Sequence, residues 1–272
     1  IFSYCTLDDV SSSYNDSLVS YFIKFNWRWN SRTFKKKSKG RRSMTLQSDI
    51  EVRNSERQEK EVILGVRDVV VQFPRRKQKT DFNAVNGVSF DLKRGETLGL
   101  VGESGSGKSM TALSLLGLVP VPGKIIEGSI NLRERRIDNL PVNELRKVRG
   151  NDLGMVFQDP MTGLNPVRNI GSQLCESVIR HQKVSKSEAT EIAFRALDDV
   201  GIPSARDRLE AFPHELSGGL RQRVMIALAL INHPEVIIAD EATTALDATI
   251  QAQILDLFRE RLSNATMILI TP

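Results

Sequence analysis

This sequence has few cysteines and no long apolar runs. Most of the chain also lacks tryptophan and tyrosine. The two cysteines, Cys5 and Cys175, stand far apart and follow no metal-binding or disulfide spacing, which favours a reduced, cytosolic compartment. No run reaches eighteen apolar residues, so we expect no transmembrane helix. A chain of 272 residues with 40% hydrophobic content can hold one large globular domain or two small ones.

The chain also lacks a charge excess outside its N-terminal region. Residues 1–43 hold nine Lys and Arg against three Asp and Glu, whereas residues 61–272 hold 26 of each sign. Both tryptophans and all three tyrosines lie in the first 43 residues as well. The neutral body gives no sign of a nucleic-acid partner.

The change of composition at Met44 has two interpretations. Residues 1–43 lie upstream of the true start, or they form a basic arm that contacts anionic lipid or nucleic acid. We favour the first. We expect residues 1–60 to form a disordered tail, basic and then polar, and residues 61–272 to form the ordered domain.

The clearest motif is a glycine-rich segment that matches the pattern G-x-x-x-x-G-K-[ST] between a predicted strand, 97–101, and a predicted helix, 110–116. All eight of its residues are expected to bind a nucleotide: Gly102, Glu103, Ser104, Gly105, Ser106, Gly107, Lys108 and Ser109. Backbone N–H groups of such a loop form an anion site at the helix N-terminus. We expect Lys108 to reach the outer phosphates and the Ser109 hydroxyl to ligate Mg²⁺.

Two adjacent carboxylates, Asp240 and Glu241, end a short apolar run that is typical of a buried parallel strand. One can hold Mg²⁺, and the other can orient and deprotonate a water molecule for in-line attack. Gln158 follows another apolar run, 153–157, and its amide could reach into the same site. Phe73, which lies 29 residues before Gly102, could stack on a nucleobase or pack in the core.

Helical patterns dominate from about residue 170 to 215. Ser185 and Glu188 form a capping box, and Ser217 can cap a helix over 220–231. For Ser217 the local pattern favours a plain cap, with a second anion site as the alternative. Asn86-Gly87 predicts a turn between two strands within 84–92.

These motifs, in this order, resemble the nucleotide-binding subunit of an ATP-binding cassette (ABC) transporter over residues 61–271. The resemblance is carried by the P-loop at 102–109, by Gln158, and by Leu216-Ser217-Gly218-Gly219, Asp240-Glu241 and Ala245-Leu246-Asp247. The segments 157–166, 213–219 and 249–254 are also similar to the oligopeptide, dipeptide and nickel importer branch of that family.

The resemblance implies an α/β P-loop fold with a mixed sheet core, a small antiparallel β subdomain and an inserted helical subdomain over about 159–226. It implies that Phe73 stacks on the base, that Gln158 senses Mg²⁺ and couples to membrane subunits, and that Asp240 is the metal partner. Glu241 would be the catalytic base. The signature residues Ser217, Gly218 and Gly219 would cap the ATP held by a second subunit. Asp247 would line the interface between the two subunits.

The implied function is ATP hydrolysis, with Mg²⁺, that powers import of oligopeptides, dipeptides or a related small solute. The implied partners are a second ATPase subunit, membrane permease subunits and, indirectly, a solute-binding protein, at the cytoplasmic face of the membrane. A soluble ABC ATPase acting on DNA or ribosomes is one alternative, disfavoured by the neutral body and by the absence of a cysteine zinc module. A non-catalytic ATP-binding regulator is another.

Three positions depart from the family pattern. Leu220 stands where Gln is usual, Ala242 replaces a Pro, and Pro272 follows Thr271 where the family has a switch histidine. The histidines of the body occupy other places: His181, His214 and His233. We therefore interpret the chain as C-terminally truncated and expect it to bind ATP but to hydrolyse it poorly.

Overall fold

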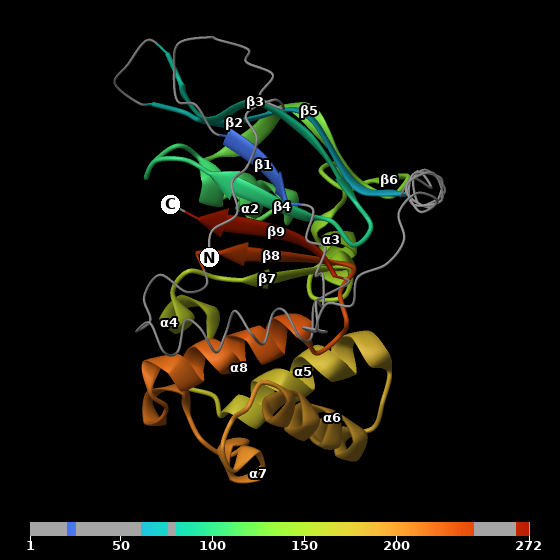
Figure 1. The fold of residues 1–272 in the computed structure, drawn as a ribbon, viewed down its shortest axis with the longest axis vertical. Coiled ribbons are helices and arrows are strands. Elements are labelled where there is room, and N and C mark those ends of the chain that lie inside the picture. Colours follow the sequence, from blue (N-terminus) through green and yellow to red (C-terminus); the bar gives the residue numbers. More distant parts are fainter. Residues whose placement is uncertain (1–20, 26–60, 76–79, 242–264, 272) are drawn as a thin grey trace, which may run out of the picture.

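The computed structural model describes residues 21–25, 61–75, 80–241 and 265–271, which form three stacked layers (Figure 1). An antiparallel sheet forms one outer layer, a mostly parallel sheet lies in the middle, and helices of residues 170–230 form the other outer layer. This is the layer architecture that a chain alternating strands and helices adopts when it buries both faces of a parallel sheet.

The middle layer is a five-stranded sheet with the spatial order β1-β4-β9-β8-β7. Its strands are β1 (Tyr21–Phe25), β4 (Thr97–Val101), β9 (Thr266–Thr271), β8 (Val236–Asp240) and β7 (Leu153–Val156). The last four run parallel, and β1 pairs antiparallel with β4 at one edge. The loops that follow β4, β7 and β8 therefore leave the sheet on the same side.

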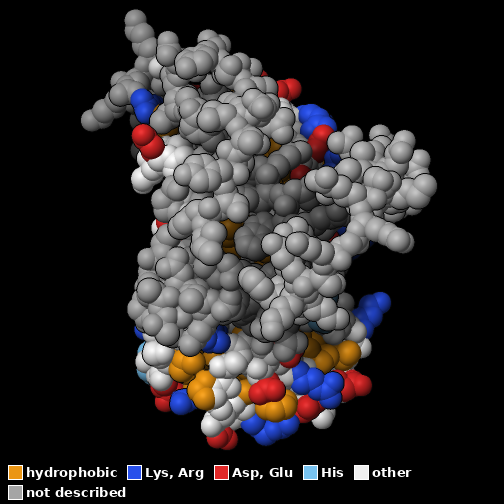
Figure 2. Space-filling view, viewed as in Figure 1, with side chains coloured by type: hydrophobic (Ala, Val, Ile, Leu, Met, Phe, Trp, Pro, Cys, Tyr) orange, Lys and Arg blue, Asp and Glu red, His pale blue; other side chains and the backbone are white. Residues whose placement is uncertain are grey.

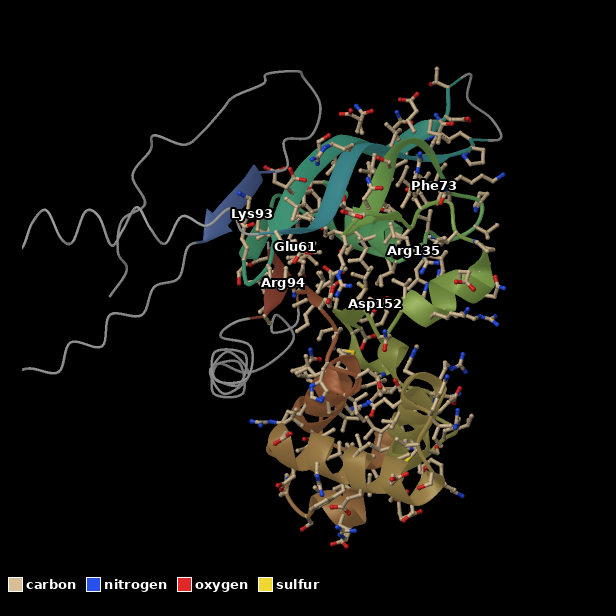
Figure 3. The ribbon with its side chains drawn as sticks, turned by 90° about the vertical axis from the view of Figure 1, so that its right-hand side faces the viewer. Glu61, Phe73, Lys93, Arg94, Arg135 and Asp152 are labelled. Carbon is tan, nitrogen blue, oxygen red and sulfur yellow. The ribbon has the colours of Figure 1, made fainter. Side chains whose placement is uncertain are left out.

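The antiparallel sheet has the order β3-β2-β5-β6. Its strands are β2 (Val62–Phe73), β3 (Phe82–Lys93), β5 (Lys124–Leu132) and β6 (Arg135–Arg136). β2 and β3 form a long ribbon that is paired from Val62 with Lys93 to Phe73 with Phe82. Near the first of these ends the guanidinium of Arg94 donates to the carboxylate of Glu61 at 2.9 Å, and Phe73 lies at the opposite end (Figure 3).

Four of the described helices begin after a residue whose side chain caps them: Asp159, Asn169, Ser185 and Ser217. The described helices are α2 (Lys108–Leu115), α3 (Val142–Val148), α4 (Pro160–Gly163), α5 (Ile170–Gln182), α6 (Lys186–Asp199), α7 (Ala205–Arg208) and α8 (Gly218–Leu230), with a 3₁₀ turn at Pro213–Glu215. The predicted capping box of α6 is confirmed: Ser185 N donates to Glu188 Oε2 at 2.9 Å, and Glu188 N donates to Ser185 Oγ at 3.2 Å.

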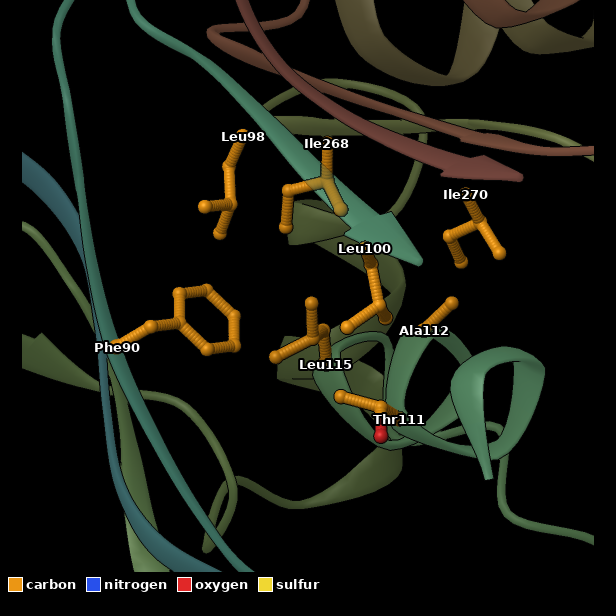
Figure 4. A pocket seen from close by; sticks show the side chains of 8 residues that line it. All are labelled: Phe90, Leu98, Leu100, Thr111, Ala112, Leu115, Ile268 and Ile270. Carbon is orange, nitrogen blue, oxygen red and sulfur yellow. The ribbon is translucent and has the colours of Figure 1, made fainter. Parts of the chain in front are cut away.

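Two apolar clusters hold the layers together. One packs α2 between the two sheets, and the other packs the helical layer against Val156 of β7 and Ala239 of β8. Within the first, eight side chains from β3, β4, α2 and β9 pack around one small, mostly apolar pocket (Figure 4). The strand ends that carry the site are thus fixed from both sides.

One expectation is wrong, and another does not hold for residues 21–25. Asn86-Gly87 makes no turn: β3 runs through it, and Gly87, at φ +70°, lies where the pairing of β3 with β2 becomes irregular. Within the tail expected to be disordered over 1–60, the described residues 21–25 form β1, whose backbone pairs with the free edge of β4.

No helix within the described ranges is long and apolar enough to span a bilayer. Charged side chains of both signs are interspersed over the helical end of the molecule (Figure 2). The amphipathic pattern of residues 248–262 predicts a further helix, and it lies outside the described residues.

Candidate functional site

The P-loop between β4 and α2 depends on two glycines with positive φ. Gly105 has φ +85° and Gly107, the N-cap of α2, has φ +89°. Glycine adopts this region without the steric penalty that a Cβ brings. A Cβ on Gly107 would also stand 2.3 Å from the carbonyl oxygen of Ala84 in β3. The loop can therefore approach the antiparallel sheet this closely only with glycine at that position.

Lys108 is buried inside the loop, with 6% of its surface exposed. Its Nζ donates to the carbonyl oxygens of Gly102 at 2.5 Å and Glu103 at 2.9 Å. A buried ammonium needs such partners, and here the loop's own backbone supplies them. The positive charge stands at the N-terminus of α2, where the unpaired N–H groups also favour an anion. This arrangement suits a phosphate group.

Ser109 and Asp240 are joined although they lie 131 residues apart. Ser109 Oγ donates to Asp240 Oδ1 at 3.1 Å. Asp240 is only 5% exposed, and burial raises the pKa of its carboxyl; the bond from Ser109 acts against this, while the neighbouring Glu241 charge adds to it. A buried carboxylate beside a hydroxyl is the kind of oxygen pair that Mg²⁺ prefers.

Gln158 and Glu241 form a second link across the site. Gln158 Nε2 donates to Glu241 Oε2 at 2.7 Å. Glu241 has φ +44°, a conformation that non-glycine residues adopt mainly where the surroundings impose it. Its backbone N–H donates to the carbonyl oxygen of Ile270 in β9 at 3.1 Å. The carboxylate is therefore projected from a fixed backbone toward the amide of Gln158.

The structure brings together the P-loop, Asp240, Gln158 and Glu241 at the carboxyl ends of β4, β8 and β7. Ser217 lies in the helical layer, where it caps α8 by accepting from Leu220 N at 3.4 Å. The following Gly218 has open space where a Cβ would stand, so this end of α8 presents a bare backbone surface. The roles predicted for Ser217, Gly218 and Gly219 in a second subunit's site stay predictions, and Asp247 lies outside the described residues.

Phe73 ends β2 with its ring over Gly123, where an added Cβ would stand 2.4 Å from the ring's Cζ. The ring also packs against the core between the sheets. Its role in stacking on a base stays a prediction. Sequence reasoning missed Ala84, whose carbonyl covers Gly107, because only the pairing of β3 could have revealed it.

A family model described as ABC transporter matches residues 85–244, more than half of the chain. The chain belongs to the ABC transporter family. One similar curated protein is the oligopeptide transport ATP-binding protein OppD of Escherichia coli strain K12, which is 50% identical over 216 residues (79% of this chain, 63% of OppD). Another is the dipeptide transport ATP-binding protein DppD of Bacillus subtilis strain 168, which is 48% identical over 214 residues (78% of this chain, 63% of DppD). The chain thus spans less than two thirds of the length of these ABC relatives.

Solved ABC structures are similar as well. The dimeric, post-hydrolysis ATP-binding cassette MJ0796 bound to ADP and Pi superposes with a TM-score of 0.67 at 28% identity, covering 76% of this chain and 87% of that one. The predicted α/β P-loop fold of the ABC ATPase type is therefore confirmed.

Proposed function

We propose that this chain is the ATP-binding and ATP-hydrolysing subunit of an ABC importer for oligopeptides, dipeptides or a related small solute. The observation that carries the proposal is the Ser109–Asp240 hydrogen bond, because it unites the phosphate-binding loop with the acidic end of β8. The ABC relatives bear the names of oligopeptide and dipeptide transport ATP-binding proteins, which favours an importer over an ATPase acting on DNA or ribosomes.

Nucleotide binding would change the hydrogen-bond partners of the Lys108 ammonium. The Lys108 ammonium has three donors, two of which are directed to the carbonyls of Gly102 and Glu103. In the bound state it would turn a donor to the outer phosphates, while the N–H groups of the loop hold the phosphate oxygens. Phe73 would stack on the base.

Ser109, Asp240 and Gln158 would hold Mg²⁺. The residues present fit this ion, because a buried carboxylate joined to a hydroxyl offers the oxygen ligands that Mg²⁺ prefers. When bound, Mg²⁺ neutralises charge that develops on the phosphate oxygens.

Glu241 would act as the catalytic base. Its carboxylate would orient a water molecule for in-line attack on the γ-phosphate and accept its proton. The fixed backbone of Glu241 and the amide of Gln158 would hold that carboxylate in one direction.

The remaining contacts of the subunit would be made with partner chains. Ser217, Gly218 and Gly219 would cap the ATP held by a second subunit, and Asp247 would line the interface between the two. Permease subunits would hold the pair at the cytoplasmic face of the membrane, where a solute-binding protein acts indirectly. The chain would then be a peripheral subunit of the transporter.

The test combines binding and turnover on the purified chain. We expect a fluorescent ATP analogue to bind, and Lys108→Ala to weaken its binding by at least about tenfold because a buried charge partner of the phosphates is lost. Phosphate release by the purified chain is expected to be slow, and Glu241→Gln should keep the binding and lower that release further. Unchanged binding in Lys108→Ala, or unchanged turnover in Glu241→Gln, would contradict the proposal.

A second experiment addresses transport. Coexpression with the permease subunits of an oligopeptide importer should yield a complex that copurifies from membranes. Binding of ATP without hydrolysis, even with a full-length partner subunit present, would instead support the non-catalytic regulator.

A further inference from the structure

Phe73 ends β2 between two neighbours of very different size. On one side its pairing partner in β3 is Phe82, which is 40% exposed and has the guanidinium of Arg75 over its ring, 4.8 Å from the ring centre. On the other side stands Gly123, the residue directly before β5, because β2 and β5 pair antiparallel up to the residue before Phe73. One neighbour is therefore large and covered, and the other has no side chain.

The ring of Phe73 takes the space that a side chain at position 123 would need. A Cβ built on Gly123 would stand 2.4, 2.6 and 2.9 Å from three atoms at the tip of the ring, which are Cζ, Cε1 and Cε2. Carbon atoms in favourable contact are about 3.5–4.0 Å apart. The position of the ring therefore depends on the missing side chain at 123.

The backbone gives no other reason for a glycine at this position. Gly123 does not have a positive φ, so alanine could adopt its conformation without the strain of the left-handed region. The chain is held on both sides, since Gly123 N donates to Pro120 O at 2.9 Å and the next residue, Lys124, pairs with Gln72. An added methyl group would therefore turn the ring away rather than move the chain.

The ring also stands close to the P-loop. Gly107 of the loop lies against the carbonyl of Ala84 in β3. Phe82 precedes Ala84 by two residues, or about 7 Å along the strand, and Phe73 lies opposite Phe82 at the end of the ribbon (Figure 3). A nucleotide whose phosphates lie in the loop is thus long enough to bring its base to Phe73.

We propose that Gly123 is a positioning residue for base binding: it leaves room for the ring of Phe73 and so sets the direction in which that ring meets the base. Cross-strand partners project from the same face of a sheet, so Phe82 bounds the ring on its other side. The inference rests on the proposed function and adds to it a residue that acts on the base through Phe73 and does not act on the phosphates.

The test compares two ligands on the purified chain by isothermal titration calorimetry. Mg·ATP has a base, whereas Mg·tripolyphosphate has the phosphate chain alone. Stacking on an aromatic ring changes the affinity for a base by roughly 5- to 150-fold, so Phe73→Ala should weaken ATP binding by about fivefold or more. Gly123→Ala should weaken it by about threefold or more, because the ring is displaced but still present. Neither variant should change the affinity for tripolyphosphate.

A double variant separates a positioning role from a structural one. Since Gly123 acts through the ring, Gly123→Ala should cause no further loss of ATP affinity once Phe73→Ala is in place. Gly65→Ala is the matched control, because it adds a methyl group to the same sheet where the nearest atom, Asp91 Oδ1, is 3.4 Å away. It should leave both affinities unchanged.

A further pair of variants keeps the test decisive if Gly123→Ala unfolds. Adding Phe82→Ala gives the displaced ring room on its other side, so the pair should fold. Compared with Phe82→Ala alone, the pair should bind ATP more weakly and tripolyphosphate equally well.

The outcomes separate the two proposals. Four results overturn the positioning role alone: full ATP affinity in Phe73→Ala, full ATP affinity in the folded Gly123 variants, equal losses for both ligands in those variants, or an added loss from Gly123→Ala after Phe73→Ala. Failure of the parent chain to bind either ligand overturns the proposed function and this inference with it.

Discussion

Two glycines of the P-loop form a matched pair that tests why the loop has its shape. Gly105 and Gly107 have nearly the same positive φ, +85° and +89°. They differ in their surroundings: no atom lies within 4 Å of a Cβ built on Gly105, whereas a Cβ on Gly107 would stand 2.3 Å from the Ala84 carbonyl oxygen. Alanine at either position brings the same backbone strain, but only at Gly107 does it also collide with β3.

The magnitudes follow from these two terms. Placing a Cβ in the left-handed region costs about 1–2 kcal/mol, which is the whole effect expected for Gly105→Ala. Overpacking against a neighbour that cannot give way typically adds about 1–3 kcal/mol, and Ala84 is held in the paired strand β3. We therefore expect Gly107→Ala to lower the free energy of unfolding by roughly 2–5 kcal/mol, a large part of a typical domain's stability.

The measurement is urea unfolding followed by far-ultraviolet circular dichroism, with ATP binding assayed in parallel. Gly107→Ala should shift the midpoint clearly further than Gly105→Ala does, and should weaken binding of the ATP analogue, because β3 and the loop must move apart. Equal losses of stability in the two variants would refute the claim that the contact with Ala84 determines the loop's approach.

Three other predictions concern stability. Asp240→Asn should raise the melting temperature of the nucleotide-free chain at pH 7, because burial raises the pKa of Asp240 and the ionised carboxylate therefore destabilises the folded state. The gain should shrink as the pH falls toward about 4, where the carboxyl group is protonated in both the folded and the unfolded state. An equal gain at both pH values would contradict this prediction. Ser185→Ala should lower the free energy of unfolding by about 1 kcal/mol through loss of the α6 cap, as urea titration can show. Leu174→Ala, at a site 1% exposed, should cost about 2–5 kcal/mol, whereas Val167→Ala, at a site 80% exposed, should stay within about 0.5 kcal/mol of the parent.

Much of the site could be predicted because its motifs are local. The spacing of glycines before Lys108 and the two carboxylates after an apolar run each specify a strand end and a loop, and the structure has β4, β8 and α2 at those places. Local chemistry also predicted the caps of α6 and α8, since a serine accepts from N–H groups only three residues away.

What could not be predicted depends on contacts between distant segments. The hydrogen bonds from Ser109 to Asp240 and from Gln158 to Glu241 join residues 131 and 83 positions apart, and no local pattern encodes them. The same holds for Asn86-Gly87, where β3 continues alongside β2 through an irregularity in the pairing despite a strong turn signal. The closeness of Gly163 to Met225 likewise follows from how α4 packs on α8 and not from either segment alone.

The position of β9 has a consequence for how the molecule assembles during synthesis. β9 pairs on one side with β4, which leads into the P-loop, and on the other with β8, which ends at Asp240. It nevertheless comes latest in sequence among the described strands. At synthesis rates of roughly 5–20 residues per second, the 31 residues from Asp240 to Thr271 take about two to six seconds to appear. Until β9 is made, β4 and β8 have no strand between them, and the edges that will pair with β9 stay unpaired. The nascent chain then has the P-loop and Asp240 but not the strand that aligns them.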